Sequence, residues 1–214
     1  DLAEAHWNKG LLCLSVGDFA RGWAGYEWRW RREGELQSRD FTQPQWRGET
    51  LVGKTILLHA EQGFGDSIQF IRYLPMVAEK GGKIILEIPD GLVPLFVNAA
   101  NIDGIYRRGD KLPHFDVHCP LMSLPLAFGT TIDTIPAFVW SALPDGSVDF
   151  INRRWLEFSG LSLDQGLGFG WEIAVHPEDR THFLEAWTAA VASGKAMEFE
   201  ARVRRADGQY RWLL

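Results

Sequence analysis

The fold of the first part of the chain is decided by residues 55–66, which read TILLHAEQGFGD. The apolar run from Thr55 to His59 predicts a buried strand, and the glycines that follow predict a tight loop ending at Asp66. An amphipathic helix comes next, and a second apolar run spans Lys83 to Ile88. Strand, glycine loop, helix and strand make a βαβ unit, so the sequence predicts a parallel sheet.

This loop carries the candidate ligand-binding residues of the first part. Gly63 and Gly65 would let the backbone approach a ligand closely, and free N–H groups at a helix start attract anions. His59 and Glu61 lie at the end of the strand, where α/β sheets place ligand-binding groups. The alternatives are a plain tight turn in which Asp66 caps the helix, and local hydrogen bonding for His59 and Glu61.

Outward from the loop, residues 2–32 predict a helical hairpin that breaks at Gly17-Asp18. Two apolar stripes run along it, and small residues between them would let the helices approach closely. A single hairpin repeat cannot bury its own apolar face, so we expect further repeats before it. The stripes comprise Ala3, Trp7, Leu11, Leu14 and Val16, then Phe19, Trp23, Tyr26 and Trp30.

Several motifs in residues 2–136 resemble bacterial tetratricopeptide-repeat glycosyltransferases related to heptosyltransferases. The motifs are GDF (17–19), GW (22–23), YEWR (26–29), WRG (46–48), GKTILL (53–58), EQGFGDSIQFIRY (61–73), FD (115–116) and SLP (123–125). The resemblance implies a tetratricopeptide-like hairpin at 1–32. It further implies that residues 33–136 are the Rossmann-like N-terminal half of a glycosyltransferase B fold.

In that family, a second Rossmann-like domain is expected to bind the sugar-nucleotide donor. Asp66 matches the residue proposed to deprotonate the acceptor hydroxyl, a task that a well-placed carboxylate can perform. Residues 137–214 do not supply the donor-binding half. We therefore expect an acceptor-side half that is not catalytic alone. The alternative is a sugar transferase whose donor half comes from another chain.

From Phe138 onward the pattern becomes antiparallel. Hairpins are predicted at 138–151 and 198–214, turning at Asp145-Gly146 and Asp207-Gly208, with a long helix at about 179–192 between them. Hairpins that flank helices make an α+β domain. The change of pattern predicts a domain boundary near Pro136.

The motifs of this second part resemble the PAS sensor domains that precede bacterial histidine-kinase cores. They are WSALPDG (140–146), FINRRW (150–155), FSG (158–160), HPEDR (176–180) and RRADGQYRW (204–212). The resemblance implies a PAS domain at 137–214 that ends before its final strand. Its expected partners are a PAS–PAS dimer, another protein, or a small-molecule ligand of unknown identity. Neither a phosphoacceptor histidine segment nor an ATP-binding motif follows.

Few residues of this part suggest a cofactor. Trp171 lies in a glycine-rich stretch and could line a pocket, whereas the other tryptophans predict core. His176 predicts a helix cap, with haem ligation by His176 or His182 as the alternative. Because no cysteine follows Cys119, cysteinyl-flavin photochemistry is excluded, and we expect no cofactor.

Composition limits the remaining functions. The net charge is −6, about −3 in each part, so a nucleic-acid partner is not expected. No apolar run is long enough to span a bilayer, and the two isolated cysteines predict reduced thiols in a cytoplasmic protein. His114, Asp116 and His118 alternate along a predicted strand, but they would need further ligands, so no metal site is predicted.

These observations give three hypotheses. The first is a signal-sensing and interaction PAS module joined to half of a glycosyltransferase. The second is a glycosyltransferase fragment that works once its donor half is supplied. The third is a chimeric or artefactual join, for which Ile135-Pro136-Ala137 would be the seam.

Overall fold

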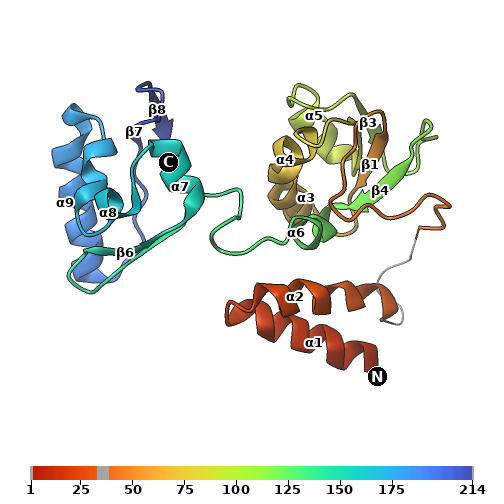
Figure 1. The fold of residues 1–214 in the computed structure, drawn as a ribbon, viewed down its shortest axis with the longest axis horizontal. Coiled ribbons are helices and arrows are strands. Elements are labelled where there is room, and N and C mark those ends of the chain that lie inside the picture. Colours follow the sequence, from red (N-terminus) through yellow and green to blue (C-terminus); the bar gives the residue numbers. More distant parts are fainter. Residues whose placement is uncertain (1, 33–38, 214) are drawn as a thin grey trace. The chain divides into compact units, whose positions relative to one another are not determined.

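We analysed a computed structural model that describes residues 2–32 and 39–213 (Figure 1). Two compact units divide the chain, Asp1–Thr131 and Ile132–Leu214, and each is described by itself. Residues 33–38 of the predicted Rossmann-like half and Leu214 of the last predicted hairpin lie outside the described residues.

The first unit begins with the predicted helical hairpin. Helix α1 spans Leu2–Ser15 and α2 spans Phe19–Tyr26, followed by a 3-10 turn at Glu27–Arg31. Asp18 caps α2, because its side chain accepts a hydrogen bond from the Arg21 N–H.

The hairpin packs through small residues rather than through the predicted stripe of large ones. The α1 residues that it buries are Ala3, Gly10 and Cys13, whereas Val16 is 72% exposed. At the crossing point a Cβ atom placed on Gly25 would lie 2.6 Å from the Gly10 Cα. The helix backbones are therefore too close for large side chains between them, and part of the predicted stripe faces away.

Next comes a four-stranded parallel sheet, as predicted. Its strands are β1 (Thr55–His59), β2 (Lys83–Ile88), β3 (Gly104–Arg107) and β4 (Val117–Pro120), in the order β3-β2-β1-β4. The outer edge of β4 is covered, since the Trp46 N–H donates to the His118 carbonyl over 2.7 Å. β1 is central and almost wholly buried.

Short helices cover one face of this sheet: α3 (Phe64–Phe70), α4 (Leu74–Ala78), α5 (Val93–Phe96) and α6 (Leu124–Ala127) (Figure 1). The single helix predicted after the glycine loop is divided into α3 and α4 by a 3-10 turn, Ile71–Tyr73. Pro75 lies in the first turn of α4, where its missing N–H interrupts the hydrogen bonding that would continue α3. Ile68 in α3 is 47% exposed.

The second unit has α+β architecture, also as predicted. It contains β5 (Trp140–Ala142), β6 (Val148–Ile151), α7 (Arg153–Ser159), α8 (Leu163–Gly166), α9 (Pro177–Ser193), β7 (Ala201–Arg204) and β8 (Tyr210–Leu213). The strands form two separate antiparallel hairpins, β5–β6 and β7–β8. Their turns need left-handed backbone at Gly146 and Gly208, with φ of 86° and 81°.

The second unit begins before the boundary at Pro136 that the pattern predicts. The Asn152 side-chain amide donates to the carbonyls of Ile132 (3.2 Å) and Ala137 (2.9 Å), and the Arg153 N–H donates to Asp133 (2.6 Å). These contacts attach residues 132–137 to the start of α7. A change of sequence pattern cannot reveal such contacts.

The hairpin packing gives a stability prediction. Gly25→Ala should destabilise the hairpin by about 1–3 kcal/mol through overpacking, although alanine is the better helix former by about 1 kcal/mol. The measurement is the reaction rate of the Cys13 thiol, which is buried in α1. The control is Gly65→Ala in α3, where an added Cβ meets nothing within 4 Å and stability should not fall. Equal effects of the two substitutions would contradict the packing argument.

Candidate functional sites: the glycine loop and the aromatic hollow

Gly63 and Asp66 form the first candidate site, after β1. Gly63 is the residue that caps α3, and no side chain completes that cap, so Asp66 does not serve as the cap. Asp66 is half-buried in the first turn of the helix, and no described residue hydrogen-bonds its carboxylate. The carboxylate is therefore available to a ligand.

Room for a ligand exists beside this carboxylate. A Cβ on Gly63 or Gly65 would meet no atom within 4 Å, and neither residue has left-handed backbone. Packing and backbone conformation thus do not require glycine at either position. What the two glycines do provide is open backbone, which a ligand could approach closely.

Glu61, in contrast, is occupied by protein contacts. Its carboxylate accepts two hydrogen bonds from the Arg29 guanidinium, at 2.8 and 2.9 Å, and one from the Met122 N–H at 3.3 Å. Both side chains are almost fully buried. Burial raises the pKa of Glu61, and Arg29 opposes that shift. This geometry favours the local hydrogen-bonding interpretation of Glu61.

The sequence pattern did not lead us to predict Arg29 as a residue of this site. Arg29 comes from the end of the helical hairpin, and it also donates to Ser123 (2.8 Å) and Glu27 (2.5 Å). A usable signal was its spacing, because Gly22, Tyr26 and Arg29 follow one another on one helical face. Burial raises the pKa of the Tyr26 hydroxyl, Arg29 opposes this shift, and the carboxylates of Glu61 and Asp66 add to it. The end of the hairpin thus lies beside the loop.

His59 lies on the other face of the sheet. Its Nε2 is 3.2 Å from the His118 Nδ1, and Phe41 packs against both rings. Burial, followed by the charges of His118 and Arg39, lowers the pKa of His59 to about 3. Burial also lowers the pKa of His118. The structure therefore does not bring His59 to the glycine loop.

His114, Asp116 and His118, which the sequence analysis considered as metal ligands, do not share a common contact. His118 pairs with His59, and the Asp116 carboxylate accepts from the Thr55 N–H over 2.8 Å. His114 precedes β4. Within residues 2–32 and 39–213, no group of three or more His, Cys, Asp or Glu side chains could hold a metal ion.

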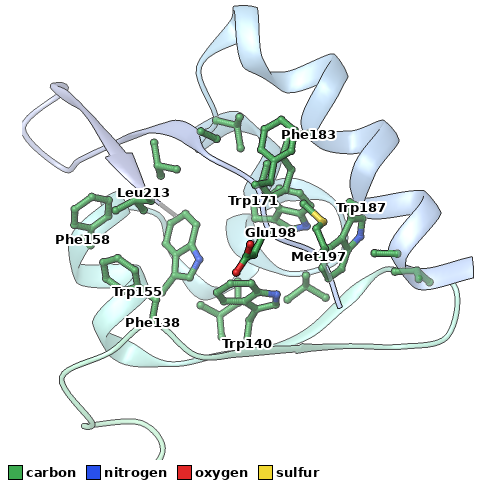
Figure 2. A pocket seen from close by; sticks show the side chains of 18 of the residues that line it. Phe138, Trp140, Trp155, Phe158, Trp171, Phe183, Trp187, Met197, Glu198 and Leu213 are labelled. Carbon is green, nitrogen blue, oxygen red and sulfur yellow. The ribbon is translucent and has the colours of Figure 1, made fainter. Parts of the chain in front are cut away.

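The second candidate site is a hollow of about 860 Å³ in the second unit (Figure 2). Aromatic and aliphatic side chains line it, and Lys195 and Glu198 are its charged residues. Trp171, predicted as a candidate pocket residue, does line it and is 8% exposed. Its indole N–H has no hydrogen-bond partner among the described residues. The other aromatic lining residues are Phe138, Trp140, Trp155, Phe158, Phe183, Trp187 and Phe199.

Two strand edges border this hollow. The outer edge of β6 is bridged by Gly168, and that of β7 by Val175. The outer edges of β5 and β8 pair with no residue in the part of the chain that the structure describes. Trp140 from β5 and Leu213 from β8 both line the hollow. Unpaired backbone edges and an unfilled apolar space therefore occur together.

The helix α9 next to this hollow is held by polar contacts. His176 is its cap, as predicted, because its Nδ1 accepts from the Glu178 N–H at 3.3 Å. Arg202 of β7 donates two side-chain hydrogen bonds to Asp179 at 2.7 and 2.9 Å, a tie not foreseen from the sequence. His182 is 82% exposed. None of the 17 residues of α9 is fully buried, so the core beneath it is incompletely filled.

Comparison with known proteins identifies this second unit. Residues 148–214 match the family described as PAS fold. The second unit contains a PAS fold. This agrees with the PAS part of the sequence prediction, whereas the matches give no support to glycosyltransferase or tetratricopeptide character in residues 2–136.

Three curated relatives are similar over part of the chain. The uncharacterized protein y4lL of Sinorhizobium fredii is 36% identical over 87 residues, 41% of this chain and 10% of that protein. The peroxide stress-activated histidine kinase mak1 of Schizosaccharomyces pombe is 32% identical over 84 residues, 39% of this chain and 5% of the kinase. Protein FlbA of Caulobacter vibrioides is 33% identical over 101 residues, 45% of this chain and 17% of FlbA.

The chain thus spans less than a fifth of the length of each of these relatives. No solved structure matches it significantly. None of the helices within the described residues is both long and apolar enough to cross a membrane.

The buried histidine pair predicts a pH dependence of stability. Because the pKa of His59 is about 3 in the folded unit and about 6.5 when unfolded, the unfolded chain binds more protons between these values. The free energy of unfolding should therefore fall as pH falls through this window, by at most about 1.4 kcal/mol per pH unit for one group.

Urea unfolding from pH 7 to pH 4 tests this, with pulse labelling of the Cys119 thiol as the reporter, since Cys119 is fully buried in β4. His59→Gln should reduce the pH dependence, whereas His182→Gln should leave it unchanged. An unchanged slope in His59→Gln would show that other groups cause it.

Proposed function

We propose that residues 132–214 are a PAS sensor and interaction module that is completed by an added β-strand. The observation that carries this proposal is that the outer edges of β5 and β8, beside the apolar hollow, pair with no described residue. The PAS fold match and the histidine kinase among the relatives support a role in signalling.

The physical argument rests on unpaired backbone groups and apolar area. An exposed strand edge presents unpaired N–H and C=O groups that readily accept another strand, and an isolated two-stranded hairpin is only marginally stable. Trp140, at the β5 edge, remains 47% exposed. A strand inserted between β5 and β8 would pair both edges and cover this apolar surface.

The hollow also indicates what kind of strand would fit. Its lining is apolar apart from Lys195 and Glu198, so the inserted strand should carry apolar side chains at alternate positions on its inner face. Recognition of this kind draws affinity from main-chain hydrogen bonds and specificity from side-chain pockets. In this proposal, a PAS–PAS dimer or another protein engages the module through these edges.

Restoring a strand tests the proposal. Residues 132–214 extended by the final strand of a related PAS domain should become a cooperative monomer. We expect its Tm to rise by at least about 10 °C, because hydrogen bonds contribute about 1 kcal/mol each and 1 kcal/mol shifts Tm by about 4–8 °C.

The control carries the same extension with prolines at two alternate positions, which removes the N–H donors that would face one neighbouring strand. It should stay associated or poorly soluble, like the unextended unit. A sharply melting, monomeric unextended unit would argue against the proposal.

For the first unit, we propose the acceptor-side half of a glycosyltransferase, with Asp66 as the base. The supporting observations are its half-buried carboxylate, which no described residue hydrogen-bonds, and the open backbone at Gly63 and Gly65. The described part of the chain contains one parallel sheet, and the proposed reaction needs a second domain for the donor. In this proposal, turnover requires a donor-binding half from outside residues 1–214.

Reconstitution tests the role of Asp66. Residues 1–131 joined to the donor-binding half of a related glycosyltransferase should release nucleotide from a sugar-nucleotide panel when acceptor is present. Asp66→Asn should lower kcat by about 100-fold or more, since general-base catalysis contributes about 10²–10⁴-fold. Asp40→Asn, at an exposed acidic residue outside the loop, should leave kcat unchanged. Full activity of the Asp66→Asn protein would exclude Asp66 as the base.

A further inference from the structure

We propose that the helical hairpin is a positioning element for the glycine loop, and that Arg29 is the positioning residue through its contacts with Glu61. The importance of this for sugar transfer rests on the proposed function of the first unit. The coupling itself is a structural claim that can be tested without any sugar.

Arg29 joins three segments that are far apart in the sequence. Its Nε and Nη2 donate to the two oxygens of Glu61, two residues before Gly63, and Nη2 also donates to Ser123 before α6. Its Nη1 donates to Glu27, which in turn accepts from the Ser123 hydroxyl at 2.9 Å. The Arg29 side chain is 1% exposed and that of Glu61 is 0% exposed, so this ion pair is screened from water.

Glu61 transmits this arrangement to the loop. Its side chain is fully buried, and its backbone carbonyl accepts a hydrogen bond from Arg108 at 3.0 Å. Arg108 also holds the Ala60 carbonyl at 2.6 Å. The connection from β1 to Gly63 is thus fixed by Arg108 through its backbone and by Arg29 through the Glu61 side chain.

Removing the guanidinium would leave the buried Glu61 carboxylate without its counter-charge, which is strongly unfavourable. Glu61 would then have to move towards water and take the start of the loop with it. The hairpin has another attachment, because the Trp23 indole donates to the Thr130 carbonyl over 2.8 Å. Loop disorder and hairpin detachment are therefore separable outcomes.

Hydrogen exchange on the full chain tests the coupling. In Arg29→Met, amides 61–67 should exchange about 10-fold faster or more, while those of β1 and β2 keep their rates. Arg29→Lys should be intermediate, because a single ammonium cannot reproduce the two-pronged contact. Arg21→Met is the matched control, since Arg21 lies on the same hairpin with a 75% exposed side chain, and it should change nothing in the loop.

Two further measurements keep the test decisive. Carbodiimide labelling should modify Glu61 in Arg29→Met but not in the unmodified chain. The double variant Arg29→Met/Glu61→Met removes both charges and should return loop exchange towards its original rate. If Arg29→Met does not fold, loop exchange in Arg29→Lys and in the double variant tests the coupling instead.

Unchanged loop exchange in Arg29→Met would overturn the inference, as would an equal increase throughout the sheet. Failure of the proposed function looks different. If Asp66→Asn leaves sugar transfer intact while Arg29→Met loosens the loop, the coupling stands and the role of Asp66 as base is rejected.

Discussion

An unpaired strand edge beside an unfilled apolar space leaves backbone groups without partners and apolar side chains uncovered, and the described residues of the second unit contain two such edges. In the first unit β1 lies between β2 and β4, and the outer edge of β4 is paired by the segment around Gln45. In the second unit each hairpin has one bridged edge and one edge without a described partner. The apolar hollow and the incompletely buried α9 accompany those two edges. In the proposed function, the pairing of an added strand with the edges of β5 and β8 is therefore the step that completes the PAS module.

The first unit depends on a different kind of contact. Three separate segments converge on the buried Arg29–Glu61 pair, and neither charge can remain buried without the other. The end of the helical hairpin lies beside the glycine loop. In the coupling proposed above, a partner that displaced the hairpin would also disturb the loop that carries Asp66. Partner binding at the hairpin and the geometry of the glycine loop would thus be coupled within the first unit.

Local pattern was enough to predict much of the fold. The run from Thr55 to His59 and its glycine loop predicted the parallel sheet, and the Asp-Gly turns at 145–146 and 207–208 predicted both hairpins. The His176 cap was also predictable, because its signal lies within a few residues. Contacts between segments that are distant in the sequence were not predictable in this way. The buried partners of Arg29, the approach of Gly10 to Gly25 and the pairing of His59 with His118 depend on tertiary packing that periodicity does not encode.

Amide exchange at the outer edges of β5 and β8 tests most directly whether an added strand completes the PAS module. We would measure the backbone N–H groups of β5 and β8 in the unextended second unit and again with a final strand present, residue by residue by NMR. We expect the outward-facing amides of Trp140–Ala142 and Tyr210–Leu213 to exchange rapidly in those unextended molecules that are not associated, and to become protected when the final strand is present. Protection of both edges in a monomeric unit without an added strand would contradict this expectation.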